Sequence, residues 1–323
     1  MLKAVILFAI GLLCLIFGGD WFVDGACSIA KKFNIPDLLI GATVVSIGTT
    51  LPEVMVSTTG AIQGSASIAY GNAIGSCICN VSLIAAITLA VSPSEKVDTS
   101  TLKVPAIFFF ISATIYAIVS YFLGTFTRTI GIVLLTVFVI YMIIQIKDAF
   151  SGKHKADDDE TDGDKDAPML KVLVLLIVGA ALIATGANLL VDNTTIIAKG
   201  FGVPDSVIAL TLVALGTSLP ELVTAITSLI KGHGLLSLGN IIGANLFNLV
   251  LVSGLAITIS PFGVPTEKTI NGMNAALVVD IPLMFIVMFI LLIPAFKDKK
   301  LYRWQGISLL CIYLAYTIFQ FLL

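Results

Sequence analysis

Long blocks of apolar residues, separated by short charged or Gly/Pro-rich breaks, make up most of this sequence. A block of about 20 apolar residues is long enough to cross the hydrocarbon core of a bilayer as a helix. The pattern predicts ten such helices, near residues 2–19, 38–63, 67–92, 103–123, 129–147, 170–190, 206–230, 235–259, 272–295 and 303–323. We therefore expect an all-α membrane protein with five helices on each side of a central polar stretch.

Composition supports a membrane protein and excludes two other classes. Of the 323 residues, 58% are hydrophobic and 12% are charged, and the mean hydropathy is +1.06. A soluble enzyme of this length would carry more charge. The net charge of −2 provides no basic surface for nucleic acid, so the expected surroundings are a lipid bilayer. The cysteines are interpreted as small buried residues, because no Cys/His pair has zinc-ligand spacing; they are Cys14, Cys27, Cys77, Cys79 and Cys311.

The central stretch, residues 148–169, is predicted to be an acidic linker between a first unit, residues 1–147, and a second unit, residues 170–323. Its acidic residues resemble the start of an EF-hand loop, with Asp158, Glu160 and Asp162 at positions 1, 3 and 5. Position 12, where such a loop needs a bidentate glutamate, is Met169. The stretch is therefore interpreted as a solvated linker.

The two units are copies of each other at a fixed offset of 168 residues. Between residues 18–93 and 186–261, 28 of 76 positions are identical without a gap. An odd number of spans in each copy makes the second copy enter the membrane from the opposite side, so the sequence predicts two inverted-topology five-helix repeats.

Lysine and arginine predict the orientation of these repeats. If the N-terminus faces out, 14 of the 18 basic residues lie on the inner side, and those outside are Lys3, Arg128, Lys199 and Lys268. We expect a multi-pass protein of the plasma membrane with both termini extracellular and a cytoplasmic linker.

Two glutamates lie near the middle of predicted spans that are otherwise free of charge. Glu53 follows Pro52 in GTTLPE, and Glu221 follows Pro220 in GTSLPE. A carboxylate at this depth costs about 3 kcal/mol on insertion scales, so each is a candidate functional residue. A proline also frees carbonyls in the preceding turn, beginning with that of Gly48 in the first copy.

Hydroxyl and amide side chains lie at helical spacing around the two glutamates. Thr49 and Thr50 precede Glu53 by one turn or less, and Thr217 and Ser218 repeat the arrangement before Glu221. The next predicted helices add further polar groups at equivalent positions; these are Ser76, Asn80 and Asn248. Oxygen ligands without histidine or thiolate suit a hard cation, calcium above all, or sodium. The glycines of these helices, Gly71, Gly75, Gly239 and Gly243, predict close helix packing.

The repeated motifs G-T-[ST]-L-P-E and G-N-x-I-G-[SA]-x-x-x-N resemble the alpha repeats of the cation/calcium exchanger superfamily, especially its prokaryotic sodium/calcium exchangers. The resemblance implies that Glu53, Glu221 and the carbonyls of Thr49 and Thr217 hold calcium. It also implies that a further set of residues forms sodium sites, namely Ser46, Thr50, Ser76, Asn80, Ala214, Ser218 and Asn248.

This sequence departs from the family pattern at two positions. Ala244 stands where the first copy has Ser76 and many relatives have serine, which removes a hydroxyl from one implied sodium site. Asn248 stands where some relatives have aspartate, which leaves two carboxylates in the site instead of three.

These features predict a secondary active antiporter, not an enzyme, that exchanges sodium for calcium by alternating access. The first and sixth helices are expected to slide against a core of helices two, three, seven and eight. The protein is expected to need no cofactor and to function as a monomer. The alternatives are a proton/calcium antiporter on the same fold, a passive cation channel, and an intramembrane hydrolase, for which the sequence lacks a nucleophile or metal motif. Asp280, in the ninth helix before Pro282, is interpreted as a cap or brace for that helix, and the alternative is a second ion path or a proton site.

Overall fold

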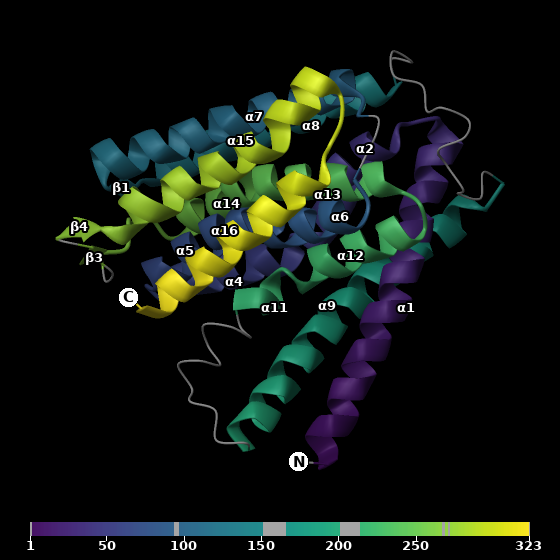
Figure 1. Cartoon of the computed structure of the whole chain (residues 1–323), viewed down its shortest axis with the longest axis horizontal. Coiled ribbons are helices and arrows are strands. Elements are labelled where there is room, and N and C mark those ends of the chain that lie inside the picture. Colours follow the sequence, from purple (N-terminus) through teal and green to yellow (C-terminus); the bar gives the residue numbers. More distant parts are fainter. Residues whose placement is uncertain are drawn as a thin grey trace.

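A computed structural model describes residues 2–93, 97–150, 166–200, 214–266, 269–270 and 272–322. Nearly all of these residues are helical (Figure 1). Several π-helical turns adjoin the α-helices and are designated η in the text. The elements of the first half are α1 (Leu2–Phe33), α2 (Asp37–Ile40), η1 (Gly41–Val45), α3 (Ser46–Thr49), α4 (Leu51–Ile62), α5 (Ala66–Cys79), η2 (Asn80–Ala85), α6 (Ala86–Val91), α7 (Thr99–Ile118), η3 (Val119–Leu123), β1 (Thr125–Phe126) and α8 (Arg128–Phe150).

The second half, like the first, begins with a long helix that is followed by shorter ones. Its elements are α9 (Met169–Gly200), α11 (Ala214–Thr217), α12 (Leu219–Ile230), α13 (Gly234–Phe247), η5 (Asn248–Val252), α14 (Ser253–Ile259), β2 (Phe262–Gly263), β3 (Thr269–Ile270), β4 (Met273–Asn274), η6 (Ala276–Asp280), α15 (Ile281–Asp298) and α16 (Arg303–Leu322). The EF-hand-like segment of the linker, residues 158–163, lies outside the described residues, as does the first part of the predicted span 206–230.

The chain is an all-helical membrane protein. Within the described ranges, seven helices are long and apolar enough to cross a membrane, and the bent pair 37–49 and 51–62, with 46° between its halves, brings the number to eight. The short strands lie outside these spans and form two antiparallel pairs, β1 with β2 and β3 with β4.

The helices α1 and α9 are much longer than predicted. The predicted ends at residues 19 and 190 were wrong, because both helices run on to Phe33 and Gly200. The prediction treated the glycines and Asp20 after Phe17 as a break. In the structure Gly18 is helical, and its small size lets α9 approach. Helix α1 ends only before Asn34, whose φ of 53° is left-handed.

The long helices α1 and α9 pack antiparallel along most of their length (Figure 1). A Cβ on Gly11 would meet the carbonyl oxygen of Gly186 at 3.0 Å, and one on Gly18 would meet that of Gly179 at 3.0 Å. Gly11 and Gly179 are equivalent in the 168-residue repeat, as are Gly18 and Gly186. Exchanging the two repeats therefore converts each of these contacts into the other. This is expected if a twofold axis runs between the two helices.

The centre of the molecule is formed by α5 and α13, which meet at equivalent residues. Asn245 donates through Nδ2 to the Cys77 carbonyl at 3.1 Å, and the Cys77 thiol donates to the Asn245 carbonyl at 3.4 Å. These two residues are 168 positions apart. The expected close packing is confirmed for Gly239 and Gly243, which lie against the backbone of Leu38 and Ala42. It was wrong for Gly71 and Gly75, where an added Cβ would meet nothing within 4 Å.

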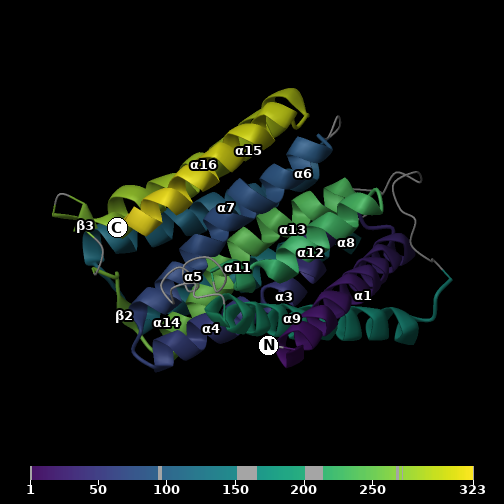
Figure 2. The ribbon, with the colours of Figure 1, turned by 60° about the horizontal axis from the view of Figure 1, so that its bottom comes forward.

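One edge of the bundle is formed by α15 and α16, and α1 and α9 lie on the opposite side of the central helices (Figure 2). At this edge the Asp280 carboxylate accepts from Tyr316 at 3.1 Å and from Gln320 at 3.0 Å, both on α16, so it joins two helices. Its capping or bracing of its own helix stays a prediction. Cys14 is half-buried and Cys311 exposed, so the prediction that all cysteines are buried was wrong for these two.

Candidate functional site

The two motifs containing glutamate and proline produce a break at the same place in each repeat. Thr50, between α3 and α4, has φ −82° and ψ −1°, and Ser218, between α11 and α12, has φ −90° and ψ 5°. Both residues leave the ideal helical conformation, in which ψ is near −42°. Each break is followed by a leucine and then by the proline, whose missing N–H costs nothing in the first turn of a new helix.

The break in the first repeat removes the regular helical partner of a backbone carbonyl. The backbone hydrogen bonds that continue across it run from the Thr50 amide to the Ser46 carbonyl, 3.0 Å, and from the Val54 amide to the Thr50 carbonyl, 3.1 Å. Pro52 has no N–H to offer the Gly48 carbonyl. The end of α3 therefore presents acceptor oxygens beside the start of α4, where Glu53 lies in the first turn.

Both glutamates are completely buried and have no partner within the part of the chain that the structure describes. Glu53 and Glu221 each have 0% exposure, and none of their four carboxylate oxygens accepts a hydrogen bond. The two carboxylates lie close enough to interact electrostatically. Buried charges in proteins are normally paired or bound to a metal ion, so four unpartnered carboxylate oxygens in one place indicate a cation site.

Hydroxyl groups of the first broken helix are buried and hydrogen-bonded, and one of them lies beside a glutamate. The Ser46 hydroxyl is within 2.8 Å of the Gly41 carbonyl and 3.0 Å of the Asn240 carbonyl. The Thr49 hydroxyl lies beside the Glu221 carboxylate and donates to Oδ1 of Asn240 at 3.2 Å. The Thr50 hydroxyl donates to the Ser46 carbonyl.

Asn240 is a residue of this site that the sequence analysis missed. Its side-chain oxygen accepts from Thr49 and from Ser46, the latter at 3.3 Å, and it is fully buried. The signal was present, since the G-N pair opens the motif in both repeats. The equivalent Asn72 donates instead to the Ser57 hydroxyl at 2.9 Å and the Glu53 carbonyl at 3.2 Å.

The predicted asparagines lie at equivalent places on the central helices. Asn80 is the first residue of η2 and Asn248 the first of η5. Both are completely buried, and the oxygen and nitrogen of each amide lack a partner among the described residues. Two amides with unsatisfied oxygens in an apolar core are costly unless a ligand uses them.

The remaining predicted residues occupy different environments. Ser76 is buried on α5 and Ala244 is buried on α13. Ser218 is buried with an unpartnered hydroxyl oxygen among the described residues. Thr217 is half-buried at the end of α11. Ala214 is the first residue of α11, and its side chain lies outside what the structure describes.

The long helices α1 and α9 cover this site. Phe22 of α1 and Ala180, Ile183 and Ala184 of α9 line a small hollow together with residues of both broken helices, namely Gly48, Thr49, Pro52 and Pro220. The ring of Phe22 lies directly against Gly48, where an added Cβ would meet it at 2.6 Å. A movement of α1 and α9 would therefore change how the broken helices are covered.

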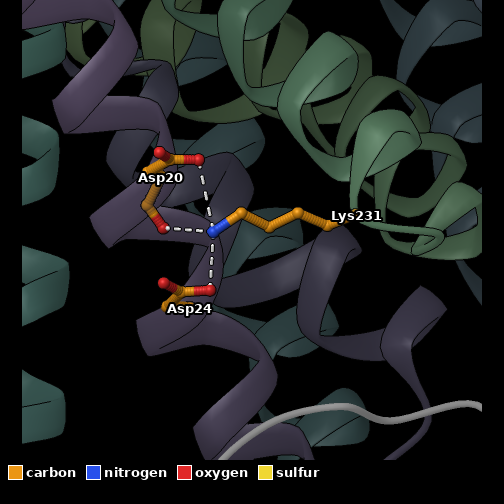
Figure 3. A network of polar contacts seen from close by, with 3 residues as sticks. All are labelled: Asp20, Asp24 and Lys231. Carbon is orange, nitrogen blue, oxygen red and sulfur yellow. Dashed lines mark hydrogen bonds and ion pairs between the residues drawn. The ribbon is translucent and has the colours of Figure 1, made fainter.

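An ion-pair network joins α1 to the end of α12 (Figure 3). The Lys231 ammonium lies 2.7 Å from Oδ1 of Asp24 and 3.3 Å from Oδ1 of Asp20, and it donates to the Asp20 carbonyl at 3.2 Å. Partial burial lowers the pKa of Lys231, but the hydrogen bonds and charges of Asp24 and Asp20 outweigh this and raise the pKa above its ordinary value. The equivalent positions in the other repeat are Asn188, Asp192 and Gln63, which contain no cation.

The donor set at the centre of the molecule consists of carboxylates, hydroxyls, amide oxygens and freed carbonyls. Calcium takes six to eight oxygen ligands of these kinds in flexible geometry. The breaks in two equivalent helices supply such ligands from both repeats, as in transporters that bind ions near the midplane.

Comparisons with known proteins agree with this chemistry. The model of a family described as sodium/calcium exchanger protein matches residues 3–147 and again residues 171–322. A membrane protein of Methanocaldococcus jannaschii is 36% identical, with 95% of this chain and 94% of the relative covered. The sodium/calcium exchanger MaX1 of Methanosarcina acetivorans is 29% identical, with 97% of each covered.

Solved structures give the same relationship. The chain resembles the sodium-calcium exchanger NCX_Mj soaked with 2.5 mM Na⁺ and 0.1 mM Ca²⁺, with a TM-score of 0.81, 32% identity, and 98% of this chain and 97% of that chain covered. A family model that matches both halves, together with close relatives over nearly the full length, places this chain in the sodium/calcium exchanger family.

Proposed function

We propose that this protein exchanges sodium for calcium across the plasma membrane by alternating access. The observation that carries the proposal is the pair of buried glutamates, Glu53 and Glu221, whose four carboxylate oxygens have no partner among the described residues. They lie at equivalent helix breaks together with the freed carbonyls. The calcium ligands are these carboxylates and the carbonyls of Thr49 and Thr217.

Sodium uses the same region. Its ligands are hydroxyl and amide oxygens beside the glutamates, with the freed carbonyls at the breaks; the residues are Ser46, Thr50, Ser76, Asn80, Ala214, Ser218 and Asn248. The site carries a charge of −2, which one calcium ion or a small number of sodium ions neutralises. Both sets do not fit together in one buried volume, so competition for the glutamates couples the two fluxes.

Alternating access follows from two inverted-topology repeats with ten spans, residues 1–147 and 170–323, joined by a cytoplasmic linker at residues 148–169. Support comes from the exchanged glycine contacts between α1 and α9 and from the Cys77–Asn245 contact, which pairs equivalent residues. A twofold axis that relates two antiparallel membrane-spanning helices is perpendicular to both of them. It therefore lies in the plane of the membrane, as the axis that relates inverted-topology repeats does. In this proposal α1 and α9 slide over α4, α5, α12 and α13.

The orientation rests on the basic residues, which place both termini outside and the loop that contains Lys231 in the cytoplasm. The Asp20–Asp24–Lys231 network then joins α1 to the core at the cytoplasmic end of the pathway. It stabilises the arrangement in which that end is closed. We propose a monomer as the working unit, because the whole site lies within one chain.

The test is calcium uptake into proteoliposomes under three conditions. We expect uptake with an outward sodium gradient and little uptake with an outward proton gradient or with no gradient. A proton/calcium antiporter would respond to the proton gradient, and a channel would equilibrate calcium without either gradient. A matched vesicle preparation of the double variant E53Q/E221Q reports leak, and the proposal fails if its uptake equals that of the wild type.

A further inference from the structure

A second group of metal-ligating side chains lies at one end of the bundle, where α1, α2 and α13 meet. Cys27 comes from α1, Asp37 is the first residue of α2, and His233 immediately precedes α13. All three residues are buried, with exposures of 2%, 4% and 6%. One ligand atom from each lies within 4.8 Å of the other two.

A histidine–carboxylate hydrogen bond accounts for only part of this group. Nδ1 of His233 lies 2.8 Å from Oδ2 of Asp37. The second oxygen of the same carboxylate, Oδ1, is buried and has no partner among the described residues. The second oxygen of this buried carboxylate can therefore still accept a hydrogen bond or coordinate a metal ion. Leaving a buried acceptor unsatisfied costs folding free energy.

The three donor atoms have the chemistry of a zinc site. Thiolate sulfur, imidazole nitrogen and carboxylate oxygen are the ligands that zinc takes, at about 2.0–2.3 Å, so tetrahedral ligand atoms lie roughly 3.3–3.7 Å apart. Nδ1 of His233 and Oδ2 of Asp37 are 2.8 Å apart, and all three ligand atoms lie within 4.8 Å of one another. Small rotamer adjustments would bring them to the separations that a bound ion requires.

We propose that Cys27, Asp37 and His233 form a binding site for one transition-metal ion of the zinc class, separate from the calcium site. The ion would join α1 to two elements of the core. Because the proposed function requires α1 to slide over that core, an occupied site holds α1 in place and slows exchange. The metal-binding step does not depend on the proposed function, whereas the inhibition does.

The binding test uses cobalt(II) as a spectroscopic probe of the purified full-length protein in detergent. Thiolate coordination gives cobalt a ligand-to-metal charge-transfer band in the near ultraviolet, which oxygen ligands at the calcium site do not produce. We expect one cobalt ion per chain with this band, displaced by zinc. The variant C27S should lose the band, and H233N should weaken cobalt binding by at least about tenfold.

Two control variants separate this site from other thiols and from the other histidine. C77S removes a buried thiol at the centre of the molecule, and H154N removes the histidine of the linker. Both should retain the cobalt band. Retention of the band in C27S would overturn the site. Absence of the band in the wild type would also overturn it, and this result does not depend on whether the variants fold.

The inhibition test measures sodium-driven calcium uptake with zinc present on both sides of the vesicle membrane, followed by a chelator. Zinc should slow the wild type reversibly and leave C27S at its zinc-free rate. Equal inhibition of both proteins would overturn the coupling to α1. Absence of zinc-free uptake in the wild type would instead refute the proposed function, while the cobalt spectrum would still decide whether the metal site exists.

Discussion

Replacing either buried glutamate by glutamine is the strictest test of the calcium site. The change keeps the size of the side chain and removes one of the two charges. Glu53 and Glu221 are both 0% exposed, so neither water nor salt screens their interaction with a bound ion. Removing one partner from a buried ionic group costs about 3–5 kcal/mol. At about 1.4 kcal/mol per tenfold change, calcium affinity should fall by roughly a hundredfold to several thousandfold.

The assay is equilibrium binding of radioactive calcium to purified E53Q and E221Q in sodium-free detergent solution, with flux in proteoliposomes as the second measurement. D192N is the matched control, because it also removes one negative charge, but from an exposed position on α9. Its calcium affinity should equal that of the wild type. If E53Q or E221Q bound calcium within about threefold of the wild type, the carboxylate would not be a ligand and the charge argument would fail.

Four further predictions concern neighbouring residues. A244S restores a hydroxyl beside a proposed sodium site and should shift the sodium dependence of exchange, while its calcium affinity stays near that of the wild type; identical sodium curves would remove residue 244 from the site. N240A leaves the Thr49 hydroxyl without its acceptor and should weaken ion binding by about 1 kcal/mol, or roughly fivefold, as measured by calcium titration; unchanged affinity would make Asn240 a packing residue only. K231Q should alter the equilibrium between inward- and outward-facing states by less than about 1 kcal/mol, and high salt should abolish the difference from wild type; a salt-independent effect would contradict the ionic role. Exchange should continue when potassium is replaced by a large organic cation at clamped membrane potential, because Asn248 adds no charge to hold a further cation; loss of flux would refute this.

The sequence predicted the helical architecture and led to the proposed chemistry of the site because both depend on local patterns. The length of an apolar block is sufficient to identify a membrane-spanning helix. A glutamate that follows a proline in such a helix can be recognised from the local sequence alone. The offset of 168 residues located both copies of the site. The predicted end of α1 was wrong because a glycine can either end a helix or allow another helix to approach closely. The local sequence does not distinguish these two roles.

Features that depend on contacts between distant segments were not predictable. Lys231 and Asp20 are 211 residues apart, and nothing in the local pattern of either indicates a partner. Cys27, Asp37 and His233 come from three elements whose spacing matches no zinc motif. Their proximity follows from the packing of α2 against both α1 and α13, which depends on the whole set of helix contacts.

Small differences between the two repeats make the two helix breaks inequivalent. Ser46 and Ser57 in the first repeat correspond to Ala214 and Ala225 in the second, so only the first broken helix offers hydroxyls at these positions. Both asparagines of the G-N pairs accordingly bond to the first broken helix, Asn240 through Ser46 and Asn72 through Ser57.

The second broken helix is left with buried hydroxyls that have no partner among the described residues, namely Ser218, Thr224 and Ser228. Where the polar groups of a helix break are already hydrogen-bonded, the conformation of the break is fixed before an ion binds. Where hydroxyls are unsatisfied, they form hydrogen bonds or ion contacts only after the break rearranges around a ligand. In the proposed site, two repeats that share 28 of 76 aligned residues therefore have different roles. We expect the first to provide a preorganised set of oxygens and the second to provide the part that adapts to the bound ion.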